Sequence, residues 1–246
     1  MLKHPIKNPW RKARTIPVGL RIYAVGDIHG NVDALRDVFA RIDADRSTSN
    51  NKRPIQVFLG DYVDRGPASR EVLDLLISRK RTDEVLLLKG NHEAMFLEFF
   101  DNPSLLQNWR QFGALPTLAS YGLRPSLNPT RDEQHELARE LAERMPPSHR
   151  QLMTAMPISF ACGDFFFAHA GVRPDVPLKH QKEQDLLWIR EDFLLYERDL
   201  EKIVVHGHTP VAEPEVRSNR INLDVGAYAT GRLACLVIDG GTIAFI

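Results

Sequence analysis

Side chains that can bind metal ions or transfer protons occur at five places in this 246-residue chain, each directly after a short apolar run. They are Asp27 and His29; Asp61, Asp64 and Arg65; Asn91 and His92; His169; and His208. Carboxylate, amide and imidazole donors without a thiolate suit Mn²⁺, Fe²⁺ or Zn²⁺ and indicate a catalytic rather than a structural metal site. The potential ligands outnumber what one tetrahedral ion needs, whereas two ions about 3.5–4 Å apart that share a carboxylate would accommodate them.

Each cluster also has a simpler explanation. Gly-Asp and Gly-Asn are common turn dipeptides, and a single histidine after a strand is more often a hydrogen-bonded residue than a ligand. Five clusters of ligand type, all in the same position relative to an apolar run, are hard to produce from turn chemistry alone. The pattern as a whole therefore favours a metal site.

The elements that would position these residues follow an α/β pattern. Apolar runs at 20–25, 55–59 and 85–88 each lead into one of the polar turns, and apolar residues then recur at helical spacing. Further strands are predicted at 158–162, 165–168, 203–205, 221–225, 233–238 and 243–246. In open α/β sheets the ligand crevice lies beyond the carboxyl ends of the strands, so the five clusters should converge there.

One domain covering 1–246 is predicted, with two segments that differ from the repeated pattern. Residues 1–19 are expected to form an N-terminal tail, and its basic part, 1–14, is expected to be solvated, with a weak contact surface as the alternative. Residues 101–157 are expected to form a helical insertion, in which Thr130 and Glu133 have the spacing of a capping box.

The composition excludes several kinds of partner. Lys+Arg and Asp+Glu are equal at 32 each, so no strongly basic face is expected for nucleic acid or an acidic membrane. No apolar run approaches the roughly 20 residues that span a bilayer, and no signal-peptide pattern follows the basic start. Two isolated cysteines, Cys162 and Cys235, suggest reduced thiols and a cytoplasmic protein.

Five motifs together resemble the phosphoprotein phosphatase family of calcineurin-like metallophosphoesterases. They are Gly26-Asp27-Ile28-His29-Gly30, Gly60-Asp61-Tyr62-Val63-Asp64-Arg65-Gly66, Gly90-Asn91-His92-Glu93, His169-Ala170-Gly171 and Gly207-His208-Thr209-Pro210. Trp109, the Thr117–Gly122 segment and the Leu186–Arg190 segment resemble the bacterial serine/threonine phosphatase branch, which includes the phage lambda phosphatase. The resemblance runs from about Arg21 to the C-terminus and implies a β-sandwich of two mixed sheets flanked by helices, with a dimetal site at the strand ends.

The resemblance also implies a role for each motif residue. Six residues would bind two metal ions, with Asp61 bridging them: Asp27, His29, Asp61, Asn91, His169 and His208. A bridging hydroxide would attack phosphorus, His92 would act as general acid and Asp64 would orient its imidazole. Arg65, with Asn91, would hold the phosphoryl oxygens, and Arg190 is a looser match for a second arginine.

Three positions leave alternatives open. Lys89 stands where many family members have arginine, which keeps the positive charge but loses the bidentate geometry. His206 lies two residues before His208 and is either packed, the favoured interpretation, or a partner of a ligand. Tyr228 either lines the cleft or is an ordinary strand-end aromatic residue.

The leading functional hypothesis is a serine/threonine protein phosphatase, with phosphotyrosine a further possibility, that uses two divalent ions, preferably Mn²⁺, and takes phosphorylated proteins or peptides as substrates. The main alternative is the symmetrical cleavage of dinucleoside tetraphosphates, or a phosphatase of broad specificity. A catalytically silent binding module is a third hypothesis, and the retained ligand set argues against it. A nuclease is disfavoured by the charge balance, and the oligomeric state stays open.

Overall fold

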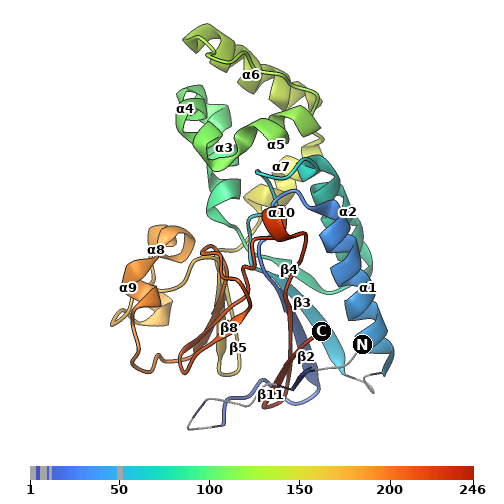
Figure 1. Ribbon diagram of the computed structural model, residues 1–246, viewed down its shortest axis with the longest axis vertical. Coiled ribbons are helices and arrows are strands. Elements are labelled where there is room, and N and C mark those ends of the chain that lie inside the picture. Colours follow the sequence, from blue (N-terminus) through green and yellow to red (C-terminus); the bar gives the residue numbers. More distant parts are fainter. Residues whose placement is uncertain (1–3, 6–9, 11–12, 49–51) are drawn as a thin grey trace.

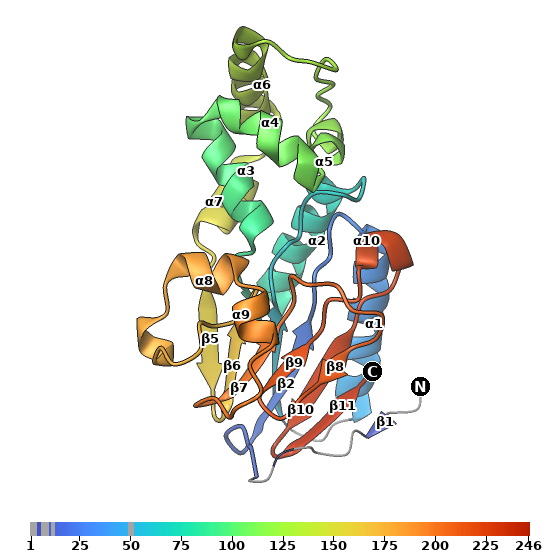
Figure 2. The same ribbon diagram turned by 60° about the vertical axis from the view of Figure 1, so that its left-hand side comes forward.

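The chain folds into two mixed β-sheets that pack face to face, with helices on both outer faces (Figures 1 and 2). The computed structural model describes residues 4–5, 10, 13–48 and 52–246. One sheet has six strands in the order β1-β11-β10-β2-β3-β4, and the other has five in the order β5-β6-β7-β9-β8. The α/β sandwich expected from the sequence is therefore confirmed.

The strands of the six-stranded sheet are β1 (His4–Pro5), β2 (Leu20–Val25), β3 (Arg53–Phe58), β4 (Val85–Leu87), β10 (Cys235–Asp239) and β11 (Thr242–Phe245). Those of the five-stranded sheet are β5 (Ser159–Cys162), β6 (Phe165–Ala168), β7 (Ile203–His206), β8 (Glu215–Val216) and β9 (Arg220–Asn222). The α-helices are α1 (Val32–Thr48), α2 (Ser69–Thr82), α3 (Asn91–Asp101), α4 (Leu106–Trp109), α5 (Ala114–Ser120), α6 (Arg131–Arg144), α7 (Pro147–Thr154), α8 (Glu183–Trp188), α9 (Glu191–Leu194) and α10 (Ala227–Thr230). Short 3₁₀ helices are η1 (Pro103–Leu105), η2 (Arg110–Phe112) and η3 (Leu178–His180).

Strand β2 shows why the sheets and helices pack in this order. Alternate residues of a strand point to opposite faces. Ile22 and Ala24 lie in the apolar core between the two sheets, whereas Tyr23 and Val25 lie in the core beneath the helices. All four side chains are fully buried, so β2 is covered on both faces.

Parallel strands in both sheets end at the same edge of the sandwich. β2, β3 and β4 are parallel neighbours in one sheet, and β6, β7 and β9 are parallel neighbours in the other. In Figure 1 their carboxyl ends point toward the helices α3 to α7, which extend beyond the sandwich. Because all five polar clusters follow these strands, the topology brings them to one edge.

The segment 101–157, expected to be helical, contains helices η1 to α7. The capping box that opens α6 is present: the hydroxyl of Thr130 accepts from the Glu133 N–H, and the Glu133 carboxylate accepts from the Thr130 N–H. The apolar face of α6 packs through Leu137 and Leu141 into the same core as α3. A local signal was enough to predict this helix.

The N-terminal tail expected at 1–19 is attached to the sandwich where the structure describes it, and the expectation of a solvated start was wrong for His4–Pro5. Strand β1 pairs antiparallel with β11, Ile16 is buried between the sheets, and the Thr15 N–H donates to the Asp164 carboxylate. Residues 1–3, 6–9 and 11–12 of the predicted tail lie outside the described residues. The attachment depends on contacts with distant parts of the chain, which local charge does not reveal.

The cysteines and the helix lengths were also considered in the sequence analysis. Cys162 and Cys235 are free and buried. Within the described ranges, no helix has the length and apolar character needed to cross a membrane.

Candidate metal centre

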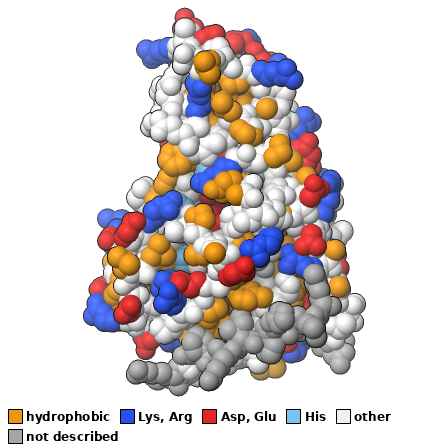
Figure 3. Space-filling view, viewed as in Figure 1, with side chains coloured by type: hydrophobic (Ala, Val, Ile, Leu, Met, Phe, Trp, Pro, Cys, Tyr) orange, Lys and Arg blue, Asp and Glu red, His pale blue; other side chains and the backbone are white. Residues whose placement is uncertain are grey.

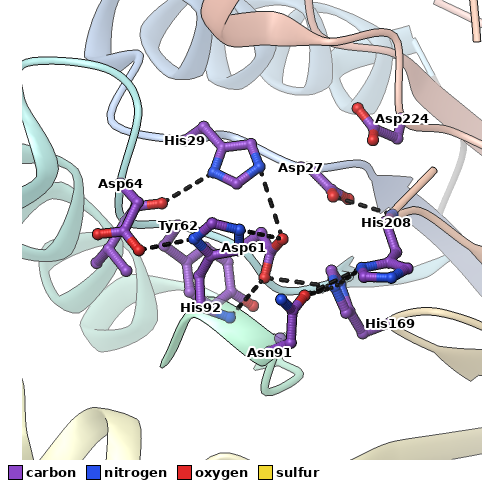
Figure 4. A network of polar contacts seen from close by, with 12 residues as sticks. Asp27, His29, Asp61, Tyr62, Asp64, Asn91, His92, His169, His208 and Asp224 are labelled. Carbon is purple, nitrogen blue, oxygen red and sulfur yellow. Dashed lines mark hydrogen bonds and ion pairs between the residues drawn. The ribbon is translucent and has the colours of Figure 1, made fainter. Parts of the chain in front are cut away.

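The five polar clusters meet around Asp61 at the carboxyl ends of the strands (Figure 4). Asp27 and His29 follow β2, and Asp61, Asp64 and Arg65 follow β3. Asn91 and His92 open α3 just after β4. His169 follows β6, and His208 follows β7. The structure therefore brings together side chains that are up to 181 residues apart in the sequence, as in the pair Asp27 and His208.

One group of donor atoms converges on the Oδ1 atom of Asp61. The Nε2 atom of His169 lies 3.3 Å from it, 2.8 Å from Asn91 Oδ1 and 3.1 Å from His208 Nδ1. His208 Nδ1 is also 3.0 Å from Asn91 Oδ1. The Nδ1 atom of His169 is 3.0 Å from the Leu59 carbonyl and donates its proton there, so Nε2 is the ring nitrogen that faces the group. Several electron-pair donors thus face one point, which is the arrangement that a cation requires.

A second group lies on the other side of Asp61. His29, Asp61 and His92 offer atoms within 4.8 Å of one another, with His29 Nε2 at 3.6 Å and His92 Nε2 at 3.7 Å from Asp61 Oδ2. His29 Nδ1 donates to the Val63 carbonyl at 2.9 Å, so its Nε2 also carries a lone pair. Asp61 is shared by both groups, as a bridging carboxylate would be.

Asp27 lies beside these groups rather than within either. Its Oδ2 atom accepts the His208 N–H at 2.9 Å, and its Oδ1 atom is buried without a hydrogen-bond partner. An unpaired buried carboxylate oxygen is costly unless a cation satisfies it. Asp27 therefore fits a ligand role.

The ionisation of the site also suits cations. Burial lowers the pKa of His29 to about 3 and that of His208 to about 2, with His169 contributing to the latter, so both rings stay neutral and keep their lone pairs. Burial and the charges of Asp224 and Asp61 raise the pKa of Asp27. Burial opposes ionisation of Asp61, but the surrounding histidines, first His169, outweigh it and hold the pKa low. The donor set therefore fits two divalent cations.

The backbone around the site is held in an uncommon conformation. Among the described residues, the non-glycine positions with positive φ are His29, Asp61, Asp64, Arg65, His208 and Asp175. All but Asp175 belong to the clusters identified from the sequence. Such conformations cost of order 1–3 kcal/mol each and persist where the surrounding structure enforces them.

Two glycines leave room for the carboxylates. A Cβ atom on Gly207 would lie 1.9 Å from Asp27 Oδ1, and one on Gly90 would lie 2.1 Å from Asp61 Oδ1. Any side chain at either position would displace a carboxylate. The glycines of these motifs therefore serve the site directly and do more than form turns.

His92 is oriented by a carboxylate that the helices hold in place. Its Nδ1 atom lies 2.7 Å from Asp64 Oδ2. The indole N–H of Trp109 donates to the same oxygen at 2.6 Å, and the Thr117 hydroxyl donates to Asp64 Oδ1 at 2.7 Å. Burial opposes protonation of His92, but Asp61 and the hydrogen bond with Asp64 outweigh it and raise the pKa. The imidazole is arranged to carry a proton toward the site.

Two carboxylates were not assigned a role by the sequence analysis. Glu93 accepts the backbone N–H groups of Gly90, Asp61 and Tyr62 at 2.7–2.9 Å and thereby joins the β3 and β4 loops. Its position in the Gly90–Glu93 motif was the available signal. Asp224 follows β9, where its Oδ1 atom accepts the Gly226 N–H and its charge acts on Asp27. Asp224 follows a strand, as the five clusters do, and this position was the available signal for it, weaker than a motif.

The cationic residues lie around the metal ligands. Arg65 is half-buried, with its guanidinium carbon 4.6 Å from the centre of the Tyr228 ring. Arg190 is exposed and donates to the Thr209 hydroxyl at 3.3 Å, beside His208. Lys89 is half-buried, and its backbone N–H donates to the Pro157 carbonyl.

His206 and Tyr228, whose roles the sequence left open, lie in different surroundings. The His206 ring is buried with its centre 5.0 Å from that of Phe193, and it belongs to neither ligand group, in agreement with the packed interpretation. The Tyr228 ring is 5.6 Å from the His29 ring, centre to centre, and is 43% exposed. Tyr228 therefore lines the site.

A two-sheet α/β sandwich with a paired Asp/His/Asn donor set at its strand ends defines a metallophosphoesterase. The family model for calcineurin-like phosphoesterases matches residues 20–233, and the chain belongs to that family. Members use a dinuclear divalent metal site, which the donor groups described above fit.

Curated relatives carry a more specific name. The asymmetrical bis(5'-nucleosyl)-tetraphosphatase PrpE of Anoxybacillus flavithermus is 26% identical over 233 residues, covering 86% of this chain and 88% of its own. The protein of the same name from Bacillus subtilis is also 26% identical, covering 85% and 87%. The expected assignment to a serine/threonine phosphatase branch is therefore not confirmed, although the wider family is.

Solved structures share the fold. A candidate diadenosine tetraphosphatase superposes with a TM-score of 0.61 at 21% identity, over 96% of this chain and 98% of its own. A cold-active protein tyrosine phosphatase of a Shewanella species gives 0.58 at 15% identity, over 94% and 78%. At these identities the comparison supports the architecture alone.

Proposed function

We propose that this chain is a metal-dependent hydrolase of dinucleoside tetraphosphates. The observation that carries the phosphoesterase chemistry is the convergence of lone-pair donors on both oxygens of Asp61. The substrate class is supported by the name of relatives that match across more than four-fifths of both chains. That name specifies asymmetrical cleavage, whereas the alternative function given in the sequence analysis was symmetrical cleavage.

The proposed metal ligands are those of the sequence analysis: Asp27, His29, Asp61, Asn91, His169 and His208. Two divalent ions, preferably Mn²⁺ with Fe or Zn as alternatives, would neutralise phosphate charge and provide a nucleophile near neutral pH. The chain itself keeps His29 and His208 neutral and Asp61 ionised, as this needs, whereas the raised pKa of Asp27 means that a cation must assist the ionisation of that carboxyl group.

The remaining site residues would bind the substrate and move a proton. His92, oriented by Asp64, would protonate the leaving oxygen from its Nε2 atom, which faces the site. Arg65 and Arg190 lie on two sides of the ligand groups and would bind phosphoryl oxygens, with Asn91 and Lys89 as further contacts.

A protein phosphatase is the second candidate function. The observation that favours it is the His92–Asp64 pair, because the alkoxide of serine is a poor leaving group that needs a proton, whereas a polyphosphate leaves readily. The same pair is compatible with tetraphosphate hydrolysis, so it does not separate the two. Action in the cytoplasm on either substrate stays a prediction.

Turnover by the Mn²⁺-loaded protein distinguishes the two candidate functions. Diadenosine tetraphosphate and a phosphoserine peptide are compared at equal concentration, with Asp61→Asn as the inactive control for both. We expect a higher kcat/KM for the nucleotide. A higher value for the peptide would overturn the proposal in favour of the phosphatase.

A further inference from the structure

Three aromatic rings stand around the metal ligands, and the proposed chemistry does not use them. Phe112 ends η2, Trp188 ends α8 and Tyr228 lies in α10; together we call them the aromatic rim. Their ring centres lie 6.1 Å from His92 for Phe112, 6.4 Å from His208 for Trp188 and 5.6 Å from His29 for Tyr228. The rim therefore reaches the site from three separate segments of the chain.

The exposure of the rim is unusual for this protein. Among the described residues, the large hydrophobic side chains that are exposed include two aromatic ones, Phe112 at 37% and Tyr228 at 43%, and both belong to the rim. The space-filling view shows pale-blue histidine atoms near the middle of one face, bordered by orange and blue side chains (Figure 3). Exposed aromatic rings beside a buried polar site offer flat surfaces on which a ligand ring can stack.

Cations accompany these rings. The Arg65 guanidinium lies over the Tyr228 ring, and Arg190 is exposed beside His208. Neither arginine forms an ion pair with a carboxylate of the described residues, whereas Arg173 and Arg232, both exposed, do so. Unpaired guanidinium groups next to stacking surfaces fit a ligand that joins a planar base to phosphate.

We propose that the aromatic rim binds the nucleobase attached to the phosphate that is hydrolysed. This inference rests on the proposed function and names the part of the substrate that the rim recognises. Because Tyr228 and Trp188 adjoin ligand histidines and Phe112 adjoins His92, the bound base must be close to the reacting phosphorus. Only the ribose separates the base from the outermost phosphate, whereas a further phosphate intervenes when an inner bond is cleaved.

The position of the rim therefore sets which bond breaks. Water adds to the outermost phosphorus, and the bond from that phosphorus to the bridging oxygen breaks. The products are a nucleoside monophosphate, which carries the oxygen of water, and a nucleoside triphosphate, whose terminal oxygen receives a proton. The base of the monophosphate half stays on the rim throughout.

Two variants that truncate a ring test this assignment in the Mn²⁺-loaded full chain. Phe112→Ala and Tyr228→Ala are each expected to raise KM for diadenosine tetraphosphate by roughly 5- to 100-fold, the loss typical of one base-stacking ring. Inorganic tripolyphosphate has the same type of bond without a base, so its KM should change less than twofold. Phe112→Tyr and Tyr228→Phe should restore nucleotide binding, and Leu127→Ala, at an exposed apolar position away from the site, is the matched control.

A binding measurement decides the inference independently of turnover. Calorimetry with adenosine monophosphate and with inorganic phosphate should show weaker binding of the nucleotide in both variants and unchanged binding of phosphate. Equal effects on the two ligands, or none on the nucleotide, would refute the role of the rim even if the tetraphosphate is a substrate. Absence of tetraphosphate turnover with rim-dependent nucleotide binding would instead refute the proposed function alone.

Two further outcomes would overturn the placement of the base. Reaction in ¹⁸O-labelled water should put the label in the monophosphate; two nucleoside diphosphates as products would show that the base lies farther from the reacting phosphorus.

A phosphotyrosine peptide carries a ring directly on its phosphate ester. If Phe112→Ala and Tyr228→Ala weaken the binding of that peptide and leave the binding of the nucleotide unchanged, the rim recognises a phosphorylated tyrosine.

Discussion

The proposed metal ligands and the aromatic rim form two parts of one site that are built in different ways. The ligands lie on short loops after parallel strands of both sheets, and all are buried. The rim lies on short helical elements, and two of its three rings are more than one-third exposed. In our proposal, the buried part performs the chemistry common to the family, and the exposed part selects what is attached to the phosphate.

Local backbone structure explains why the two parts can change independently. The ligand loops are constrained by positive φ angles, by glycines without room for a Cβ atom and by the Glu93 carboxylate that joins two loops. The rim residues meet two ligand histidines and His92 in edge-on ring contacts, at 5.6–6.4 Å between centres. A change in the rim should therefore alter binding, whereas a change in the loops should abolish reaction.

The largest effect is expected for Asp61→Asn. The variant removes the carboxylate shared by both donor groups, so it should lose bound metal and at least about 10³-fold in kcat on every substrate, because several kcal/mol of charge stabilisation disappear. Metal content and turnover are measured together, with chelator-treated wild type as the reference. Asp175→Asn, at an exposed position that also has positive φ, should keep both properties. Full activity in Asp61→Asn would disprove the assignment of the buried part.

His92→Asn should lower kcat more for a substrate with a basic leaving group than for one with a weakly basic leaving group. Loss of a general acid should lower kcat by roughly 10²–10⁴-fold for a phosphoserine peptide. The loss should be smaller for diadenosine tetraphosphate, whose leaving polyphosphate is less basic. The comparison is made at saturating substrate, with binding of adenosine monophosphate as a check that the rim is intact. Equal losses on both substrates would argue against proton donation by His92.

Asp64→Asn should change the pH dependence of the reaction. The neighbouring carboxylate raises the pKa of His92, so the protonated imidazole persists to higher pH in the wild type. With a neutral amide in place of the carboxylate, that pKa falls, and the alkaline limb of the kcat profile should move to lower pH with a roughly 10–100-fold loss of rate near neutrality. Asp33→Asn, on the surface of α1, should leave the limb unchanged. A limb that stays in place would mean that another group titrates.

Gly207→Ala tests the packing of a ligand loop through the stability of the metal-free protein rather than through turnover. The new methyl group would meet Asp27 Oδ1 at 1.9 Å, so either the loop or the carboxylate must move. We expect a loss of about 1–3 kcal/mol in the free energy of unfolding of the metal-free protein, measured with urea. Gly241→Ala, where the nearest atom would be at 3.5 Å, is the matched control. An unchanged midpoint for Gly207→Ala would show that the loop adapts without strain.

Much of the metal centre could be predicted from the sequence because its determinants are local. Each cluster follows an apolar strand by a fixed short spacing, and parallel strands of one sheet end at a common edge. The Thr130–Glu133 capping box was equally local. Residues such as Asp27 and His208 could therefore be placed together without knowledge of their contacts.

Features that depend on contacts between distant segments could not be predicted. The pairing of β1 with β11 joins residues more than 230 positions apart, and nothing in the charged start of the chain indicates it. Trp109 and Thr117 matched a motif, but their hydrogen bonds to Asp64 appear only when the helices pack on the β3 loop. The specific branch of the family was also not confirmed, because short motifs are shared between branches that differ in substrate.

The amino-acid sequence by itself determined the donor chemistry, because ligand type and spacing after a strand are properties of short segments. Only the tertiary structure decided that Phe112, Trp188 and Tyr228 surround those donors. Each ring comes from a different segment, and the packing of these segments determines which residues the ring contacts. Strand periodicity acts over a few residues, whereas the placement of short helices depends on the whole core beneath them.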